Sequence, residues 1–528
     1  MVWDIDQPYK SESKKIVWDV APYLKGRGLD IGAGEFKVLP HAISVDNMHH
    51  AQFGFSMRPD VTVKTAEDLG IFASQSLDFV YSSHLLEHMA DPEKVLREWW
   101  RVVKPKGCMV LYLPHEDFYP KVGEKGANPD HKHNLNEEKI RQWMIGIGFW
   151  DLELCEKRDQ DDEYSFLMVF RKLERGSRRE KYPDSYLDPK PGKTACVVRY
   201  GAFGDLMMAS SVWAGLKKQG YHVTVFASPP GSDVITEDPN IDKLVLFDVD
   251  QVPNANLGDF WAVQKKKFDK FVNLCESVEM TFLAMPNRTQ HFWPPGVRHK
   301  LLNHNYLQHQ HELAGVPHDP QVKFFPTIEE KRWAEDTRHK MKADLVVMWS
   351  LAGSSVHKTW GGLDNILASI MLLFPNVHVV LVGAGDCKIL EAGWEKEPRI
   401  HKQSGIWKMR QTMAFMSQCD LIIGPETGVL NAASCMDVSK VCLLSHSSYE
   451  NLTRDWKNTI AISSENTVCP GRGENEAPTC HQLHYGWAHC KKDEKSGTAQ
   501  CQAEITVEEV WTHVDWCLQA LSAQKKVA

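Results

Sequence analysis

Asp205 follows two glycines, Gly201 and Gly204, at a place where a carboxylate could act as a general base. The run 194–198 reads as a short strand, Gly201 and Gly204 bracket a tight turn, and helical spacing resumes from Leu206. Asp205 then lies at a helix N-terminus, where free amides and the helix dipole favour a carboxylate. Such a group could accept a proton from a hydroxyl, although helix capping alone would also explain an aspartate here.

A second glycine turn lies near the start of the chain. Residues 28–31, with Asp30, read as a strand that leads into Gly32 and Gly34, and a backbone without side chains lets a nucleoside approach closely. Asp46 ends the next apolar run, where an acidic side chain can accept both hydroxyls of a ribose. An ordinary strand-to-helix turn would show the same glycines, so the pattern alone leaves both interpretations open.

The elements that position these residues must belong to several domains. The chain has 528 residues, 43% of them hydrophobic, which is enough for three or four packed domains. The net charge of −8 argues against a dedicated nucleic-acid binder. The chain shows no secretory signal and no apolar run of membrane-spanning length, and its cysteines are mostly scattered singly. We therefore expect a cytoplasmic protein without a transmembrane segment.

Several ordered runs after residue 190 resemble the heptosyltransferase-like glycosyltransferases of family 9, over about residues 193–520. The runs that carry this resemblance are 199–205 (RYGAFGD), 209–211, 238–242 (DPNID), 268–274, 358–360 and 424–428 (GPETG). The resemblance implies the two-lobed GT-B architecture. It also implies inverting, metal-independent transfer from a nucleotide-diphosphate sugar to a hydroxyl of a glycan or another acceptor.

The same resemblance implies roles for individual residues. Asp205 would deprotonate the acceptor hydroxyl, and Lys358 would pair with donor phosphate. Glu426 and Asn431 replace the aspartate and histidine that are usual in the family, so the sugar and the nucleotide stay open. The residues expected on the donor are Lys358, Gly383, Asp386, Glu426, Thr427, Gly428 and Asn431.

The N-terminal part resembles the class I S-adenosylmethionine-dependent methyltransferases, over about residues 24–172. The runs that carry this resemblance are 28–35, 66–69, 76–88, 91–92 and 101–107. It implies S-adenosylmethionine as cofactor, with the glycine turn at its methionine part. The residues expected on the cofactor are Asp30, Gly32, Gly34, Asp46 for the ribose, and Ala66 and Glu67 for the adenine.

Four histidines are candidate bases for methyl transfer: His84, His115, His131 and His133. Solvated loop histidines are common at such a place before a helix, so we expect no metal ion there. A degenerate methyltransferase fold with a purely structural role is the alternative.

The fold class expected is α/β, with three Rossmann-like domains: one class I methyltransferase domain and a two-lobed GT-B glycosyltransferase. Residues 174–192 are charged and proline-bearing, as in a linker. The predicted limits are 1–173 for the methyltransferase-like domain, 174–192 for the linker, 193–340 for the acceptor lobe and 341–528 for the donor lobe.

A cysteine-bearing loop at 469–501 precedes the final helix, which we expect to be capped by Thr506 and to run through Leu521. Structural zinc, disulfides and unpaired thiols all remain open, because the spacing lacks a Cys-x-x-Cys pair. A structural role is favoured over a catalytic one. The cysteines concerned are Cys469, Cys480, Cys490 and Cys501.

Together these patterns predict a bifunctional transferase that glycosylates an acceptor and methylates the same or a related one. Its small-molecule partners would be a nucleotide sugar and S-adenosylmethionine. Two alternatives are a non-catalytic binding or scaffold protein on degenerate enzyme folds, and a nucleic-acid base modifier. The acidic net charge makes nucleic acid the less expected partner.

Overall fold

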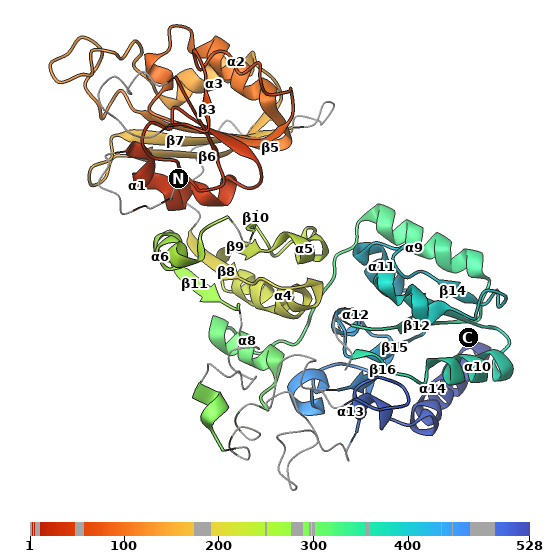
Figure 1. The fold of residues 1–528 in the computed structure, drawn as a ribbon. Helices are drawn as coiled ribbons and strands as arrows, with labels where there is room; N and C mark the ends of the chain where they lie inside the picture. Colours follow the sequence, from red (N-terminus) through yellow and green to blue (C-terminus); the bar gives the residue numbers. More distant parts are fainter. Residues whose placement is uncertain are drawn as a thin grey trace. The chain divides into compact units, whose positions relative to one another are not determined.

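The chain folds into two compact units, seen in a computed structural model (Figure 1). The first comprises Met1–Pro191 and Phe247–Phe268, and the second Gly192–Leu246 and Asp269–Ala528. The structure describes residues 3, 5, 11–47, 58–173, 192–248, 251–275, 289–294, 297, 301, 303–353, 358–434, 436–445, 447–464 and 492–527.

The first unit contains a seven-stranded sheet of order β3-β2-β1-β4-β5-β7-β6. Strands β1 to β5 pair in parallel, and β7 runs antiparallel to both of its neighbours. The strands are β1 (Gly28–Ile31), β2 (Ile43–Asp46), β3 (Val61–Thr62), β4 (Leu77–Ser83), β5 (Val103–Pro114), β6 (Trp150–Arg158) and β7 (Ser165–Lys172). Its helices are α1 (Glu12–Val20), α2 (Pro92–Val102), α3 (Glu137–Ile145) and α6 (Leu257–Lys266), with a 3-10 turn η3 (Leu86–His88).

Helix α2 shows how local sequence builds this unit. Asp91 caps the helix by accepting a hydrogen bond from the Lys94 amide at 3.0 Å, and Pro92 opens the first turn with a preset φ. The apolar residues of α2, which include Trp99 and Trp100, are buried in the core beside the sheet. This amphipathic helix therefore packs against β4 and β5.

The segment Phe247–Phe268 packs within the first unit, although its place in the sequence is inside the predicted 193–340 lobe. The ring of Phe260 lies 6.5 Å from that of Trp18 in an edge contact, and the Gln264 side-chain amide donates to the Trp18 carbonyl at 2.6 Å. Lys267 pairs with the buried Asp19 carboxylate at 2.5 Å. The limits predicted for the individual domains remain a prediction.

The second unit contains two wholly parallel sheets, of orders β10-β9-β8-β11 and β14-β13-β12-β15-β16-β17. The strands are β8 (Lys193–Val198), β9 (Tyr221–Ala227), β10 (Lys243–Leu246), β11 (Lys270–Asn273), β12 (Leu345–Ser350), β13 (Val377–Val382), β14 (Ile400–Lys402), β15 (Leu421–Pro425), β16 (Ser439–Leu444) and β17 (Thr459–Ser463). The helices are α4 (Phe203–Lys218), α5 (Pro229–Ser232), α8 (Tyr306–Ala314), α9 (Ile328–Met341), α10 (Leu363–Leu373), α11 (Met409–Met416), α12 (Gly428–Ala433), α13 (Gln500–Ala503) and α14 (Val507–Val527).

All three sheets share one topological feature. In each, the first strand is central, the second pairs on one side and the fourth on the other: β1 between β2 and β4, β8 between β9 and β11, and β12 between β13 and β15. The order in which strands are added reverses at such a switch point, and the loops beyond the strand ends diverge to leave a crevice for a ligand. The expected α/β class with three Rossmann-like sheets is confirmed.

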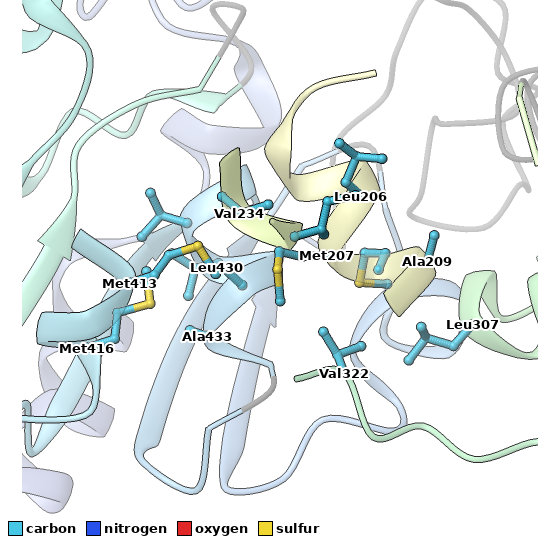
Figure 2. Packing of buried hydrophobic residues seen from close by; sticks show 14 of the residues in the cluster. Leu206, Met207, Ala209, Val234, Leu307, Val322, Met413, Met416, Leu430 and Ala433 are labelled. Atoms are coloured by element: carbon cyan, nitrogen blue, oxygen red, sulfur yellow. The ribbon is translucent and has the colours of Figure 1, made fainter. Parts of the chain in front are cut away.

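The two sheets of the second unit share a hydrophobic core. Met207 and Ala209 of α4 join Met413 of α11 and Leu430 of α12 in one buried cluster (Figure 2). The first turns of α4 and α12 each begin near a glycine, Gly204 and Gly428, and each contributes a buried leucine, Leu206 or Leu430, to this cluster. The core therefore holds together the loops that follow β8 and β15.

The last helix, α14, begins where the sequence predicted a Thr506 cap and continues beyond Leu521 to Val527. The Thr506 hydroxyl accepts a hydrogen bond from the Glu509 amide at 3.1 Å, which satisfies one of the first free amides of the helix. No helix within the described ranges combines the length and apolar character that crossing a bilayer requires.

Candidate functional sites

A cavity of about 650 Å³ opens beyond the C-terminal ends of β1, β2 and β4. Its wall includes Gly32 and Gly34 after β1, Asp46 at the end of β2, Ala66 and His84. This is the crevice that the strand order predicts for the first sheet, at the switch point between β1 and β4. Four of the six residues predicted to bind the cofactor thus line one cavity.

The glycine turn at the cavity requires residues without side chains. Gly32 has φ of 76° and Gly34 has φ of 56°, both in the left-handed region that disfavours other residues. A Cβ on Gly32 would lie 2.8 Å from the Leu85 side chain, whereas the space around Gly34 is open. The turn is anchored by the Gly32 amide, which donates to the Val45 carbonyl at 2.8 Å.

The two predicted aspartates occupy different positions. Asp46 lines the cavity, and its carboxylate accepts a hydrogen bond from the Gly34 amide at 3.1 Å. Asp30 is buried behind the turn, where its carboxylate accepts from the Val38 amide at 2.7 Å. Burial raises the pKa of Asp30 to about 7. Asp30 therefore supports the loop, while Asp46 faces the space in which a ligand would lie.

The two residues predicted to contact adenine, Ala66 and Glu67, lie in different surroundings. Ala66 lines the cavity, and its carbonyl is held by the Trp99 indole N–H at 2.9 Å. Glu67 instead forms an ion pair with Lys94 of α2 at 2.9 Å.

The four candidate histidines lie in distinct environments. His84 lines the cavity and its Nε2 contacts the Ser165 hydroxyl at 2.9 Å, whereas His115 Nε2 contacts the Glu137 carboxylate at 3.0 Å. His133 Nε2 contacts the Met89 carbonyl at 3.0 Å, and His131 is buried. Burial lowers the pKa of His84 to about 3 and also lowers that of His131, so both rings are neutral near pH 7.

Sequence reasoning did not single out Glu87 or His88. Glu87 is fully buried, and burial raises the pKa of its carboxyl group to about 8. His88 lines the cavity, with its Nδ1 3.2 Å from the Asp130 carbonyl. The signal in the sequence is the spacing His-x-x-Glu-His at 84–88, which places two imidazole rings and one carboxyl group in one short turn after β4.

In the second unit, Asp205 is the third residue of α4. One carboxylate oxygen accepts from the Ala202 amide at 2.9 Å, and the other accepts from the Arg199 guanidinium at 2.8 Å. Arg199 is only 2% exposed and also donates to the Leu274 carbonyl at 3.0 Å, whereas the Asp205 side chain is 37% exposed. The aspartate is thus both a helix-capping group and a charge partner with an accessible edge.

The loops after β8 and β15 meet at glycines. A Cβ on Gly204 would lie 2.8 Å from the Gly428 Cα, and a Cβ on Gly428 would lie 2.6 Å from the Phe203 ring. Asn431 of α12 is also at this contact, since its amide nitrogen is 3.3 Å from the same Gly204 position. Because Gly204 and Gly428 have no side chains, the first turns of α4 and α12 can approach closely. This contact places Asp205 near the 424–428 motif.

The other residues predicted to contact a donor follow the C-terminal ends of β12, β13 and β15. Thr427 bonds the Ser350 hydroxyl at the end of β12 at 2.9 Å, and a Cβ on Gly353 would touch both Lys358 (2.7 Å) and Thr427 (3.3 Å). The structure thus brings together Lys358, Thr427, Gly428 and Asn431 around the loops after β12 and β15.

Three predicted donor residues differ in exposure. Glu426 is buried, and its carboxylate accepts from the Ser445 hydroxyl at 2.7 Å and the Ser447 amide at 3.2 Å, so it braces the loop after β16. Gly383 follows β13, and a Cβ there would lie 2.6 Å from Cys387. Asp386 is exposed in the turn that follows.

Two further sequence features have structural counterparts. Asp238 of the 238–242 run is buried and accepts from the Trp213 indole at 2.7 Å, which ties that loop to α4. Cys501 is buried on α13. Cys469, Cys480 and Cys490 lie outside the described residues.

Residues 29–111 match the family described as methyltransferase domain. A probable S-adenosylmethionine-dependent methyltransferase of Mycobacterium tuberculosis is 28% identical over 80 residues, which are 15% of this chain and 29% of that protein. The chain therefore spans less than a third of the length of this curated relative.

Two solved structures resemble a larger part of the chain. The ADP-heptose LPS heptosyltransferase II of E. coli matches 63% of this chain and 99% of its own, at 16% identity and a TM-score of 0.44. A glycosyl transferase family 9 protein from Veillonella parvula matches 62% of this chain and 98% of its own, at 15% identity and a TM-score of 0.44. The chain thus combines a stretch, residues 29–111, that is similar to methyltransferase domains with a second unit of two parallel α/β sheets.

Proposed function

We propose that the chain is a two-site transferase, with an S-adenosylmethionine-dependent methyltransferase in residues 1–173 and a glycosyltransferase in residues 193–528. The cavity beyond β1, β2 and β4 carries the first assignment, because it gathers the glycine turn, Asp46 and Ala66 at one switch point. The meeting of the two glycine loops at Gly204 and Gly428 supports the second.

In the first site, the sulfonium of the cofactor is already a reactive methyl donor, so the protein chiefly aligns the acceptor and assists loss of its proton. The glycine turn would face the methionine part, because only bare backbone fits between it and Leu85. Asp46 would accept the ribose hydroxyls, and Ala66 would lie beside the adenine. His84 and His88 stand on the wall where an acceptor would meet the methyl group.

In the second site, Asp205 would take the proton of an acceptor hydroxyl, whose oxygen attacks the anomeric carbon from the face opposite the leaving group. The carbon–oxygen bond to the nucleoside diphosphate breaks as the new bond forms, which inverts the configuration. Lys358, the Thr427 hydroxyl and the backbone amides that follow would stabilise the charge that develops on the diphosphate. Lys358 and these amides supply the positive charge, so the proposal includes no metal ion.

Isothermal titration calorimetry of the full chain against S-adenosylhomocysteine and a panel of nucleoside diphosphates tests both assignments. We expect both ligand types to bind, with Asp46→Asn weakening only the first and Lys358→Ala only the second. Loss of charge-assisted hydrogen bonds to ribose should weaken binding by about 10- to 100-fold.

Matched controls separate site effects from loss of charge. Asp159→Asn, in the turn between β6 and β7, and Lys340→Ala, on the exposed part of α9, remove the same charges away from both sites. Both control variants should bind like the wild type. A wild-type chain that binds neither ligand type would refute the enzyme assignment and favour a scaffold built on enzyme folds.

A further inference from the structure

The turn after β4 and the segment before α3 converge on one buried carboxylate. One Glu87 oxygen lies 3.8 Å from His84 Nδ1, 3.9 Å from His88 Nε2 and 3.8 Å from His131 Nε2. The ligand atoms of Glu87, His88 and His131 all lie within 4.8 Å of one another. Two ring nitrogens and one carboxylate therefore lie close enough to share one ion, and the His84 ring lies beside the same carboxylate.

The Glu87 carboxylate lacks the partners that burial normally demands. Its side chain is 0% exposed, and neither oxygen has a hydrogen-bond partner among the described residues. Burying a polar group without partners costs several kcal/mol, and an isolated charge costs more. Its backbone carbonyl, in contrast, accepts from the Lys132 amide at 2.8 Å, which fixes the His131 segment against the turn. The carboxylate is thus held in place and aimed at the three rings.

In His84 and His88, the ring nitrogen other than the one nearest Glu87 already has a hydrogen-bond partner. His84 Nε2 contacts the Ser165 hydroxyl at 2.9 Å, and His88 Nδ1 contacts the Asp130 carbonyl at 3.2 Å. A carbonyl can only accept, so His88 Nδ1 must carry the hydrogen and its Nε2 lone pair points at Glu87. A ring nitrogen bound to a backbone carbonyl on its far side is the usual outer support of a histidine that binds a metal.

The backbone at His84 adds an independent observation. Its φ is 48°, in the left-handed region that costs a residue with a side chain about 1 kcal/mol or more. His84 directly follows β4, and its Nδ1 lies 3.8 Å from the Glu87 carboxylate. Strain of this kind at a cavity wall is typical of functional positions.

We propose that Glu87, His88 and His131, with His84 beside the carboxylate, bind a divalent transition-metal ion in the wall of the methyltransferase cavity. Imidazole with one carboxylate suits zinc, cobalt and related ions rather than magnesium or calcium, which prefer oxygen ligands. A tetrahedral ion with bonds of about 2.1 Å holds its ligand atoms about 3.4 Å apart. The observed 3.8–3.9 Å separations need only a small contraction of side chains around the ion.

The position of the ion would define its role, and this step rests on the proposed methyltransferase function. Because His84 and His88 also line the cavity, the ion would face the acceptor and bind its oxygen. A bound hydroxyl loses its proton to solvent more readily, the oxygen then bonds to the methyl carbon, and the carbon–sulfur bond breaks to leave a neutral thioether. The acceptor would therefore be an oxygen nucleophile that can bind a metal.

Metal content of the full chain tests the site without requiring activity. The chelator-treated protein is dialysed against Zn²⁺ or Co²⁺, and bound metal is measured by mass spectrometry for the wild type, Glu87→Gln, His131→Ala and His88→Gln. We expect each variant to retain one equivalent fewer than the wild type, or to bind that equivalent at least about 100-fold more weakly. Subtracting the metal content of each variant from that of the wild type removes the contribution of any metal held by cysteines elsewhere in the chain.

His133→Gln is the matched control, because it lies two residues from His131 but contacts the Met89 carbonyl instead of Glu87. It should bind as much metal as the wild type. Equal metal in the wild type and in the folded ligand variants overturns the site. S-adenosylhomocysteine binding, measured in parallel, distinguishes the two proposals. If the wild type binds the metal but not S-adenosylhomocysteine, the metal site is supported and the methyltransferase function is refuted.

Circular dichroism identifies any ligand variant that does not fold. Glu87→Gln preserves the side-chain shape and removes only the charge, so it is the variant expected to fold even where His131→Ala does not. The proposal is then decided on the folded variants alone.

Discussion

Replacing Asp205 should destabilise the second unit even before any effect on catalysis is measured. Its carboxylate is the charge partner of Arg199, whose guanidinium is 2% exposed. Removing one partner of a buried pair typically costs about 3–5 kcal/mol, because the other charge is left without compensation. Asp205 is 37% exposed, so water replaces part of the lost interaction and we expect about 2–3 kcal/mol for Asp205→Ala.

The thermal shift follows from the size of the unit. A unit of about 300 residues has an unfolding entropy near 0.6 kcal/mol/K, so this loss should lower its Tm by about 3–5 °C. Differential scanning calorimetry of the full chain measures the shift. Asp205→Asn keeps an acceptor oxygen for only one of the two donors, Arg199 or the Ala202 amide, and it also removes the negative charge beside Arg199. It should therefore lower the Tm by about 3–5 °C, as much as Asp205→Ala does.

A double-mutant cycle separates the pair from other effects. Arg199→Met alone also loses the bond to the Leu274 carbonyl, and we expect Arg199→Met with Asp205→Ala to cost about 2 kcal/mol less than the sum of the single changes. Additive effects, or an Asp205→Ala variant with the wild-type Tm, would refute the charge-partner reasoning. A folded Asp205→Asn variant that retains sugar transfer would refute the proton-acceptor role.

Three other outcomes follow from the structure. Gly428→Ala places a Cβ 2.6 Å from the Phe203 ring and should destabilise the contact between α4 and α12 by about 1–3 kcal/mol in urea unfolding. Gly32→Ala combines a left-handed φ with a Cβ 2.8 Å from Leu85, and should weaken S-adenosylhomocysteine binding at least about 10-fold in calorimetry. The pKa of Asp30 is about 7 in the folded state and near 4 in the unfolded state. Between these two pH values the native state therefore binds more protons than the unfolded state. As the pH rises from 4 to 7, the free energy of unfolding of the first unit should fall by up to about 4 kcal/mol. Urea unfolding across that range should show this slope in the wild type and a flatter one in Asp30→Asn.

Several elements could be predicted from the sequence because their causes are local. A short run with apolar residues that ends in a glycine turn predicts a strand followed by a close backbone approach, as at Gly32 and Gly204. The cap at Thr506 and the helix that follows are likewise decided within a few residues. The cavity location also follows, since parallel strands of one sheet end at the same edge.

Other features depended on packing between distant segments. Glu426 belongs to a donor motif by sequence, yet its carboxylate is buried against the loop after β16. The segment Phe247–Phe268 lies inside the acceptor lobe by order along the chain, yet it packs in the first unit through Phe260 and Gln264. The local sequence does not specify which buried surface a segment packs against.

Taken alone, the sequence determined the α/β class and the glycine turns, because hydrophobic period and backbone freedom act over a few residues. The tertiary structure alone decided which side chains share a point in space. His131 reaches Glu87 only because the segment before α3 is held against the turn after β4, and Arg199 becomes the partner of Asp205 only because α4 and β11 enclose its guanidinium. These polar groups become candidate functional residues because they are buried next to one another. Their burial depends on how the whole chain packs.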